Sequence, residues 1–511
     1  MLNYFVYKSV ISTTILCLLR PTYSQTIDGC PMYGCRPSGT FSFVLDAPRV
    51  NATIGWVNDF FLGPIPEALG CVGNTFTLVC QSNGPGPGDT GLLALNLDTG
   101  SVRWRDMVLR FPTLPVLDEQ GNLWGTDGSS LMHYDVAGKP MSQIELEPRI
   151  RPLFGLQYVD PDLLLFVSET GQISTRTSDG TPMAELYLKG TVERANGTFI
   201  PTAPAVVNGN RFYVLTEFAP DDNEQVANLG LQRLYAIDAF ERMADRLVIA
   251  WYANFEKETA AVVQQSLKFK PKSFQKRLIH KIKRETQRKP SLLWDSFHRT
   301  VFVSLPPPVL STREGQNGIE SLIGIKDLGN NSALVFKVER SASNMVLYER
   351  NSGSMKPPAN AGAQLWISLP DSKLLAIEPD GNISKAIDVS KILKTNFTIT
   401  SKISSARSRE IDEDFLIFGI KVTTPTEEFQ KLVESYGIDT SEATPTCYVV
   451  GVDTPENTNV PNSMVWIVPT PDDIEVNGQI IGIKGDNTGR KDQIIAFAQM
   501  EERYGKIFSI V

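Results

Sequence analysis

Histidine is scarce in this chain, with three residues, His133, His280 and His298, among 511. None of them stands at the His-x-x-x-His spacing by which a helix presents two ligands to zinc, so the sequence argues against a zinc centre. A Gly-x-Ser-x-Gly elbow is also absent, which removes the usual motif of a serine hydrolase. A Ser-His-Asp triad assembled by the fold stays open as an alternative. Because no complete catalytic motif is present, we favour a non-enzymatic protein.

Long apolar runs are also lacking. The run at residues 10–19 holds ten residues, whereas a bilayer-spanning helix needs about 20. It follows Lys8 and precedes the small residues of Thr22-Tyr23-Ser24. This order predicts a signal peptide at residues 1–24 and a mature chain that starts near Gln25, with an uncleaved anchor as the alternative. No later run reaches spanning length, so we expect a secreted, extracellular protein without a transmembrane segment.

Five Asn-x-Ser/Thr sequons accord with export, and none has proline in the middle. Such sequons accept N-linked glycans on exposed loops of secreted proteins. The predicted glycosylation sites are Asn51, Asn196, Asn330, Asn382 and Asn396.

The six cysteines become five when Cys17 leaves with the leader, and Cys447 is the expected odd thiol. The predicted disulfide cysteines are Cys30, Cys35, Cys71 and Cys80. A turn at Gly73-Asn74 would place the first hairpin cysteine opposite Phe76 and the second about 13 Å along the strand. That separation exceeds the Cα reach of a disulfide, about 7 Å. We therefore predict that Cys30 and Cys35 bridge to Cys71 and Cys80.

The overall composition is that of an ordinary globular protein, with 42% hydrophobic and 21% charged residues. It excludes a disordered chain, a collagen and a polytopic membrane protein. The length allows either three domains or one large all-β domain.

An internal repeat decides between these two. Its clearest copy is Ala94-Leu95-Asn96-Leu97-Asp98-Thr99-Gly100-Ser101-Val102-Arg103-Trp104. Weaker copies begin at His133, Thr175, Ala236, Gly324, Ala376, Gly451 and Ala496. Each copy follows another strand pair, often with a Gly-Asn or Gly-Gln turn, so each unit is predicted to form four short antiparallel strands, A to D. Eight such units predict an all-β, eight-bladed β-propeller, with a pair of β-sandwiches as the alternative.

The clearest copy resembles the repeat of pyrroloquinoline-quinone-type propellers, Ala-x-Asp-x-x-Thr-Gly-x-x-x-Trp, with Asn96 at the Asp position. Ala236-Ile237-Asp238 with Trp251 is a stretched second match, and residues 376–381 are a partial third. The resemblance implies a quinoprotein-like eight-bladed propeller over residues 63–511. It implies little about function, because that fold serves enzymes, assembly factors and binding scaffolds.

Residues 25–62 precede the first predicted blade. They contain a plausible strand at 41–45, and we expect them to form a disulfide-linked clasp between blades one and eight. The last repeat ends at Val511, so the eighth blade is expected to have its own outer strand.

Enlarged connections are predicted on one face of the propeller, where B–C loops and D–A connections meet. This face is the candidate functional surface, because rigid scaffolds carry binding sites on loops. The enlarged connections are residues 84–88, 218–230, 256–290, 306–319 and 423–446. The last is predicted to be helical, with a capping box from Thr424, Pro425 at the first helical position, an apolar stripe and a stop at Gly437.

A second helical insertion, residues 256–290, carries the strongest local charge. Residues 268–289 have a net charge of +9, against −19 for the rest of the mature chain, because they contain one acidic residue, Glu285, and ten basic residues. The basic residues are Lys268, Lys270, Lys272, Lys276, Arg277, Lys281, Lys283, Arg284, Arg288 and Lys289. Such a helix fits an acidic protein, a sulfated glycan or an anionic membrane surface. Nucleic acid is disfavoured by export. The alternatives are a solvated insertion that pairs with the protein's own acidic surface, and proteolytic processing at its dibasic pairs.

A quinoprotein dehydrogenase would need a calcium site, an acidic base and a planar cofactor pocket in the central channel. No adjacent cysteine pair, a frequent cover of that cofactor, is present. We predict no cofactor and a secreted glycoprotein that acts as a binding or scaffold module. A quinone- or calcium-dependent oxidoreductase is the alternative. Candidate Ca²⁺ clusters are Asp160-Asp162, Asp221-Asp222-Glu224, Asp412-Glu413-Asp414 and Asp472-Asp473.

Overall fold

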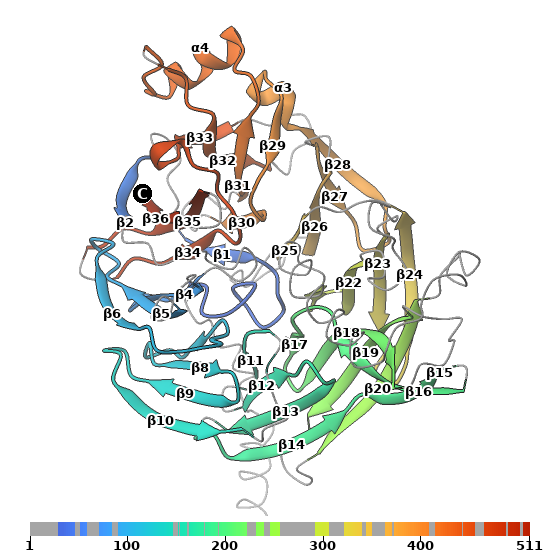
Figure 1. Ribbon diagram of the computed structural model, residues 1–511. Coiled ribbons are helices and arrows are strands. Elements are labelled where there is room, and N and C mark those ends of the chain that lie inside the picture. The colour runs from blue at the N-terminus through green and yellow to red at the C-terminus, as the bar shows by residue number, and fades with distance from the viewer. Residues whose placement is uncertain are drawn as a thin grey trace, which may run out of the picture.

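Eight antiparallel sheets stand around a common axis, each with one strand toward the centre and one at the rim (Figure 1). The inner strands of most neighbouring sheets contact each other. The fold is therefore the expected eight-bladed β-propeller. The computed structural model describes residues 29–45, 52–58, 71–83, 90–146, 152, 154–160, 163–177, 179–192, 194–221, 231–239, 246–255, 292–305, 321–339, 344–349, 363–369, 373–407, 414–441, 443–454, 464–486, 489–500 and 504–511.

Blades 1 to 4 are built from consecutive strands, inner strand first. They consist of β3 (Cys71–Gly73), β4 (Leu78–Asn83), β5 (Thr90–Leu95) and β6 (Val102–Asp106); β7 (Val116–Leu117), β8 (Leu123–Asp127), β9 (Ser130–Tyr134) and β10 (Pro140–Glu145); β11 (Gln157–Asp160), β12 (Leu163–Val167), β13 (Gln172–Thr177) and β14 (Pro182–Tyr187); and β17 (Val206–Asn208), β18 (Arg211–Pro220), β19 (Gln232–Ala239) and β20 (Leu247–Phe255). Blade 4 is widened by β15 (Lys189–Val192) and β16 (Ala195–Pro201), which pairs with β18.

Blades 5 to 7 follow the same order. They consist of β21 (Leu292–Asp295), β22 (Thr300–Leu305), β23 (Ser321–Asp327) and β24 (Ser332–Glu339); β25 (Asn344–Glu349), β26 (Ala363–Ser368), β27 (Lys373–Ile377) and β28 (Ile383–Asp388); and β30 (Ser404–Arg407), β31 (Asp414–Val422), β32 (Cys447–Asp453) and β33 (Met464–Pro469). Between blades 6 and 7 lie α3 (Val389–Leu393) and β29 (Phe397–Ile399). Helix α4 (Glu427–Ser435) lies between β31 and β32 of blade 7, and the short 3-10 turn η2 (Pro471–Asp473) follows β33.

Blade 8 differs, because both ends of the chain build it. Its three inner strands are β34 (Ile481–Ile483), β35 (Gln493–Met500) and β36 (Tyr504–Ile510), and its outer strand is β2 (Ile54–Asn58). The expectation that the last repeat, which ends at Val511, supplies this blade with an outer strand of its own is wrong. The repeat copy at Ala496 was also misaligned, since it lies on the second strand, whereas the other seven copies lie on third strands. Gly478 correspondingly precedes the inner strand and does not turn between the first two.

The alanine and the tryptophan of the repeat motif lie opposite each other on the third and fourth strands of a blade. Ala94 pairs with Trp104, and Ala236 pairs with Trp251 in the same way. A register shift interrupts the pairing of the third and fourth strands in all eight blades, including the pair of β36 with β2. Such a bulge bends an outer strand and increases its twist. Because β2 carries it too, β2 is an outer strand of the same kind as the others.

An aromatic ring of the preceding blade packs on the glycine of the motif. Gly100, at positive φ in the turn of blade 1, lies under the Trp56 ring of blade 8, and a β-carbon there would collide with the indole. Gly138 in blade 2 lies under Trp104 of blade 1 in the same manner. Glycine permits both the turn and the close approach. The Thr-Gly and Trp of the repeat therefore connect neighbouring blades.

Both disulfides are local, which corrects the predicted pairing. Cys30 bonds to Cys35, and Cys71 bonds to Cys80, whose Cα atoms lie 4.1 Å apart. The hairpin turn is longer than expected, because Asn74 accepts hydrogen bonds from the backbone of residues 76 and 77. This brings Cys71 directly opposite Cys80 in the β3–β4 pair. No disulfide therefore ties the N-terminal segment to a blade, while Cys447 is free and buried as expected.

No helix among the described residues is long and apolar enough to cross a membrane. The predicted signal peptide lies outside the described part of the chain.

Candidate functional site

The axis of the propeller is the place where the quinoprotein resemblance would put a cofactor. Here it holds residues 29–45, which we call the axial segment (Figure 1). Backbone hydrogen bonds of 2.8–3.0 Å connect this segment to the inner strands of blades 1, 2, 4, 5, 6 and 7 in chain order. They join Cys30 to Gly73, Pro31 to Leu117, Pro37 to Val207, Ser38 to Trp294, Thr40 to Leu347, and Phe41 to Ser405.

The axial segment ends in β1 (Ser42–Val44), which pairs in parallel with β30 of blade 7. Its apolar side chains are buried, with Tyr33, Phe41 and Phe43 exposed by 4%, 0% and 2%. On blade 8, a β-carbon at Gly482 would collide with the Phe43 and Leu45 side chains. The segment thus makes a nearly complete circuit inside the ring and occupies its centre.

These residues do not fit pyrroloquinoline quinone on the axis. A planar cofactor needs an open slot between the inner strands, and the chain's own buried aromatic side chains stand there. The described residues also contain no group of three His, Cys, Asp or Glu side chains that could hold a metal ion. Among the proposed Ca²⁺ clusters, Asp473 instead accepts hydrogen bonds from Thr446 and from the Cys447 backbone, and Asp472 pairs with Lys506. The other three clusters lie partly or wholly outside the described residues.

The charged side chain of Lys402 packs against the axial segment. Lys402 is 2% exposed, and its Nζ donates to the Tyr33 hydroxyl at 3.3 Å. The same Nζ lies 4.8 Å from the centre of the Tyr33 ring and 5.5 Å from that of Phe41. Burial lowers the pKa of the Lys402 ammonium to about 7. Sequence reasoning missed this residue, because nothing near position 402 indicates that residues 33 and 41 will cover it.

The two described histidines occupy different environments. His133 lies on β9 as expected and stacks on Trp124, with ring centres 3.9 Å apart, and burial lowers its pKa. His298 Nδ1 lies 2.6 Å from the carboxylate of Asp295, a fully buried residue. This pair has the form of a base with its orienting acid. Among the described residues no serine or threonine hydroxyl bonds to the other ring nitrogen, so no triad is assembled. His280 lies outside the described residues.

The insertion-rich face is described mainly at α4. Thr426 is the N-cap and accepts from the Phe429 amide, so the helix begins after Thr426, two residues later than a cap at Thr424 predicted. The expected apolar stripe is present: Phe429 and Val433 are buried, and Phe429 packs edge-on against Tyr448 of β32. The stripe is therefore used to attach the helix to blade 7. Its solvent side carries Glu427, Glu428, Lys431 and Glu434.

The other enlarged connections lie outside the described residues, apart from the first residues of the blade 4 loop. This includes the whole basic insertion, from Lys268 to Lys289, so its predicted helix stays a prediction. Of the five sequons, Asn51 also lies outside. The remaining four are all exposed, at Asn196, Asn330, Asn382 and Asn396.

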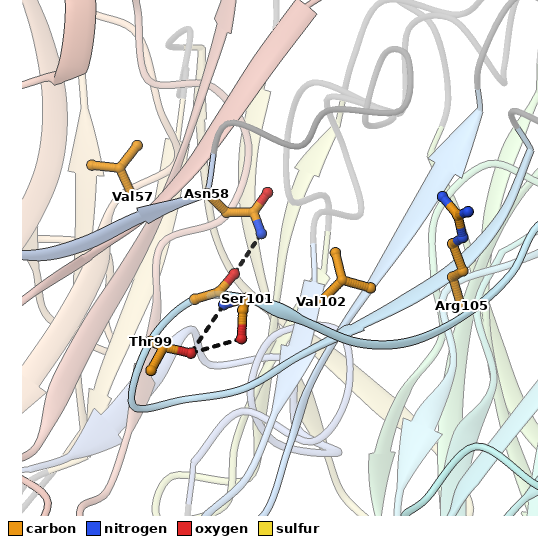
Figure 2. A pocket seen from close by; sticks show the side chains of 7 residues that line it. Val57, Asn58, Thr99, Ser101, Val102 and Arg105 are labelled. Atoms are coloured by element: carbon orange, nitrogen blue, oxygen red, sulfur yellow. Dashed lines mark hydrogen bonds between the residues drawn. The ribbon is translucent and has the colours of Figure 1, made fainter.

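A shallow cavity of about 480 Å³ lies at the rim between β2 of blade 8 and β6 of blade 1 (Figure 2). Val57 and Val102 supply its apolar part. Its polar groups bind each other, since Asn58 donates to the Gly100 carbonyl and the Thr99 and Ser101 hydroxyls are 2.7 Å apart. The cavity is therefore chiefly a part of the contact between two blades. The sequence gives no signal for it, because its residues come from segments about 40 positions apart.

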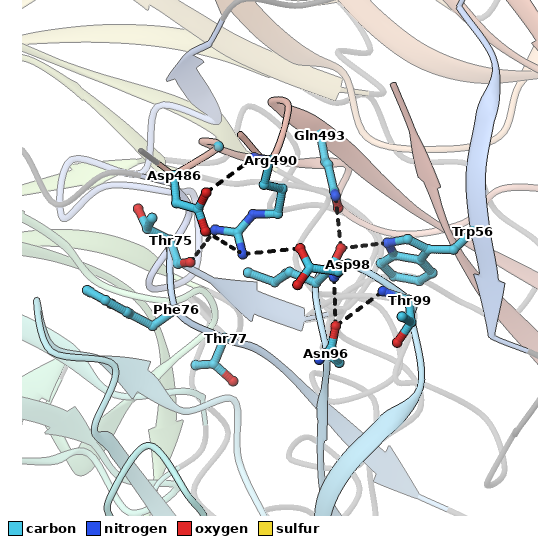
Figure 3. A network of polar contacts seen from close by, with 12 residues as sticks. Trp56, Thr75, Phe76, Thr77, Asn96, Asp98, Thr99, Asp486, Arg490 and Gln493 are labelled. Atoms are coloured by element: carbon cyan, nitrogen blue, oxygen red, sulfur yellow. Dashed lines mark hydrogen bonds and ion pairs between the residues drawn. The ribbon is translucent and has the colours of Figure 1, made fainter. Parts of the chain in front are cut away.

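The same boundary carries a polar network around Arg490 (Figure 3). The guanidinium donates to the Thr75 carbonyl and lies 3.6 Å from Asp486 and 3.7 Å from Asp98. Beside it, Trp56 Nε1 and Gln493 Nε2 both donate to the Leu97 carbonyl at 2.8 Å. The network joins β2, the eighth blade and the repeat turn of the first blade.

Comparison with known proteins assigns no family to this chain. No family model matches the chain, and no curated protein matches it. Solved structures similar to it include a europium-containing methanol dehydrogenase, with a TM-score of 0.49, 10% identity, and coverage of 95% of this chain and 98% of that one. BamB from Moraxella catarrhalis has a TM-score of 0.42 and 10% identity, over 89% of this chain and 97% of that one. The C-terminal WD40 domain of Sif2 has a TM-score of 0.42 and 9% identity, over 92% and 99%. The strand order of the chain itself establishes the eight blades.

Proposed function

We propose that this protein is a secreted glycoprotein that acts as a binding or scaffold module through the insertion-rich face of its propeller. The observation that carries the proposal is the axial segment. It fills the centre of the ring, where an axial cofactor would sit, with buried aromatic side chains. A closed and rigid ring leaves the loops as the surface for recognition.

Export is supported by the covalent chemistry of the described chain. Two disulfides are formed, and such bonds persist in oxidising compartments. The four described sequons are exposed, as acceptors of N-linked glycans must be. Treatment of the secreted protein with an N-glycosidase should lower its apparent mass by several glycans. A protein recovered only inside cells and without glycans would contradict this part of the proposal.

The partner that we propose is anionic, either an acidic protein surface or a sulfated glycan. Residues 268–289 carry a net charge of +9 in an otherwise acidic protein, which favours binding to such a surface. Deletion of residues 268–289 should abolish retention on heparin at physiological salt. A control chain that keeps the segment but replaces its ten basic residues by glutamine should behave like the deletion. Unchanged retention of either variant would contradict the proposed contact.

The alternative function, a quinone- or calcium-dependent oxidoreductase, is tested by a separate experiment. Incubation of the protein with pyrroloquinoline quinone and Ca²⁺, followed by a dye-reduction assay with alcohols and sugars, should give no turnover above the control without quinone. Reproducible turnover would replace the proposal with the quinoprotein alternative.

A further inference from the structure

The outer strand of blade 4 has an unusual edge. β20 is nine residues long and contains no charged residue, proline or glycine. Among the described outer strands, every other one contains a charged residue or a proline, except the five-residue β2. Charges and prolines protect edge strands from pairing with other chains. Among the described residues β20 pairs only with β19, and its Ile249 and Tyr252 side chains are 38% and 53% exposed.

An arginine surrounded by aromatic rings lies beside this edge. The guanidinium carbon of Arg233, on β19, is 4.0 Å from the ring centre of Phe199 and 4.3 Å from that of Tyr252. Its Nε donates to Asn254 Oδ1 at 2.6 Å, and Nη1 donates to the Tyr235 hydroxyl at 3.0 Å. Because Asn254 and Tyr252 are on β20, these contacts hold the guanidinium against the edge strand.

The charge of Arg233 is not balanced within the described chain. Its two hydrogen-bond partners are neutral, and its other contacts are aromatic faces. By contrast, Arg211 on the neighbouring strand of the same blade binds two carboxylates. A partly buried guanidinium that stacks on aromatic rings is a favourable site for a carboxylate, because charge-assisted hydrogen bonds are strong there.

We propose that β20 and Arg233 together form a binding site for an extended acidic peptide segment of a partner protein. The edge of β20 supplies the backbone pairing, as in recognition by strand addition. An added strand lies about 4.8 Å from β20, so a glutamate side chain on it reaches the guanidinium. Tyr252 and Ile249 cover apolar side chains of the same segment. The proposal uses no residue of the segment 268–289.

The probe for this site is a fluorescein-labelled octapeptide of alternating threonine and glutamate, measured by fluorescence anisotropy with the full mature protein. Two control peptides replace glutamate by glutamine, or carry N-methyl groups on alternate residues and so cannot extend a sheet. Arg233→Gln is the test variant. Arg103→Gln is its matched control, because Arg103 lies on outer strand β6 and donates to the Phe76 carbonyl.

The expected result is that the glutamate peptide binds wild type and Arg103→Gln equally. Arg233→Gln and the glutamine peptide should each weaken binding about tenfold or more, the loss expected for a charge-assisted hydrogen bond. The N-methylated peptide should not bind. Arg233→Lys serves as a second variant in case Arg233→Gln does not fold. It keeps the positive charge but lacks the planar guanidinium, so it should fold and bind the glutamate peptide with intermediate affinity.

Three results would overturn the proposal. Equal affinity of wild type and Arg233→Gln would show that the guanidinium does not contact the peptide. Binding of the N-methylated peptide would exclude strand addition. A dimer in sedimentation that dissociates in Arg233→Gln, without peptide binding, would assign the edge to a second copy of this chain. The heparin experiment with the deletion of residues 268–289 tests the proposed function, and its outcome does not affect these three results.

Discussion

Blades 4 and 8 reach the same four-stranded core arrangement by different means. The strands that span blade 4 come from one continuous stretch, and its contact with blade 5 combines apolar packing with a buried ionic cluster. Arg211 binds Asp238 and Asp327 at 2.6–2.9 Å, and Asp327 also accepts from Tyr213 and Trp251. Burial by itself would raise the pKa of the Asp327 carboxyl, but Arg211, Tyr213 and the Gly329 amide hold it below its ordinary value. Blade 4 is thus joined to its neighbour by short, buried polar contacts.

Blade 8 relies on backbone and apolar contacts instead. Its strand β2 comes from the other end of the chain and pairs with β36, while Trp56 packs on Gly100 of blade 1. The nearby Arg490 lies 3.6–3.7 Å from its carboxylates, one of which, Asp98, is 64% exposed. Ion pairs of that kind contribute little to stability. The comparison indicates that a ring closed by chain ends depends on the N-terminal segment more than on charge pairing.

Removal of the N-terminal segment should therefore have the largest effect of any change considered. A chain of residues 59–511 lacks both β2 and the axial segment, which leaves blade 8 with three strands and the inner strands without their central partner. We expect no cooperative unfolding transition in calorimetry, whereas residues 25–511 should show one. Addition of a synthetic peptide of residues 29–58 should restore the transition. A truncated chain with unchanged melting temperature would contradict the role assigned to this segment.

The ionic contact of blade 4 should come next. Asp327→Ala leaves Arg211 partly buried beside one carboxylate, and loss of a buried charge partner typically costs about 3–5 kcal/mol. The matched control is Asp238→Ala, since Asp238 binds the same arginine but is 24% exposed. Urea unfolding should show a loss for the control of about 1 kcal/mol. Equal losses for the two variants would mean that burial does not distinguish these carboxylates.

The sequence predicts the regular part of this architecture well, and the reason is local. Seven repeat copies align with third strands because each copy lies in one local stretch of the chain that contains the third strand and the turn after it. The stretched match of Ala236 to Trp251 is confirmed by the pairing of these two residues. Helix α4 was also predictable from its local apolar stripe and its stop, although the sequence placed the cap two residues too early.

The parts that the sequence does not predict all depend on distant contacts. The misaligned eighth copy follows from a strand supplied more than 400 positions away. The disulfide pairing failed because the side chain of Asn74 lengthens a turn, and a shift of four residues changes which cysteines face each other. The axial segment is held by backbone hydrogen bonds to six of the eight blades, and such bonds depend on no particular side chain. Lys402 is recognisable only once that segment is in place.

The Cys71–Cys80 bond offers a smaller test of the closure. It crosses the innermost hairpin of blade 1, next to the backbone bonds between Cys30 and Gly73. Replacement of both cysteines by serine should lower the free energy of unfolding by about 2–3 kcal/mol, the range for short loops. Thermal unfolding of the oxidised proteins measures this. The Cys30→Ser/Cys35→Ser chain is the companion variant, and it should lose more if the axial segment must keep its bend to seat in the ring.

Lys402 gives the most specific test of the central segment. Its pKa is about 7 in the folded protein, and that of an unfolded lysine is about 10.4, so between these values only the unfolded chain keeps the proton. The stability of wild type should therefore rise with pH from 7 to 10 relative to Lys402→Met, by at most about 1.4 kcal/mol per pH unit. Urea unfolding at pH 7, 8 and 9 measures the difference, in which other titrating groups cancel. The control is Lys391→Met, because the Lys391 side chain is 85% exposed. A plot of its free energy of unfolding against pH should run parallel to that of wild type. If the Lys402→Met line is parallel as well, the ammonium is not desolvated by Tyr33 and Phe41, and the axial segment does not seal the centre of the ring.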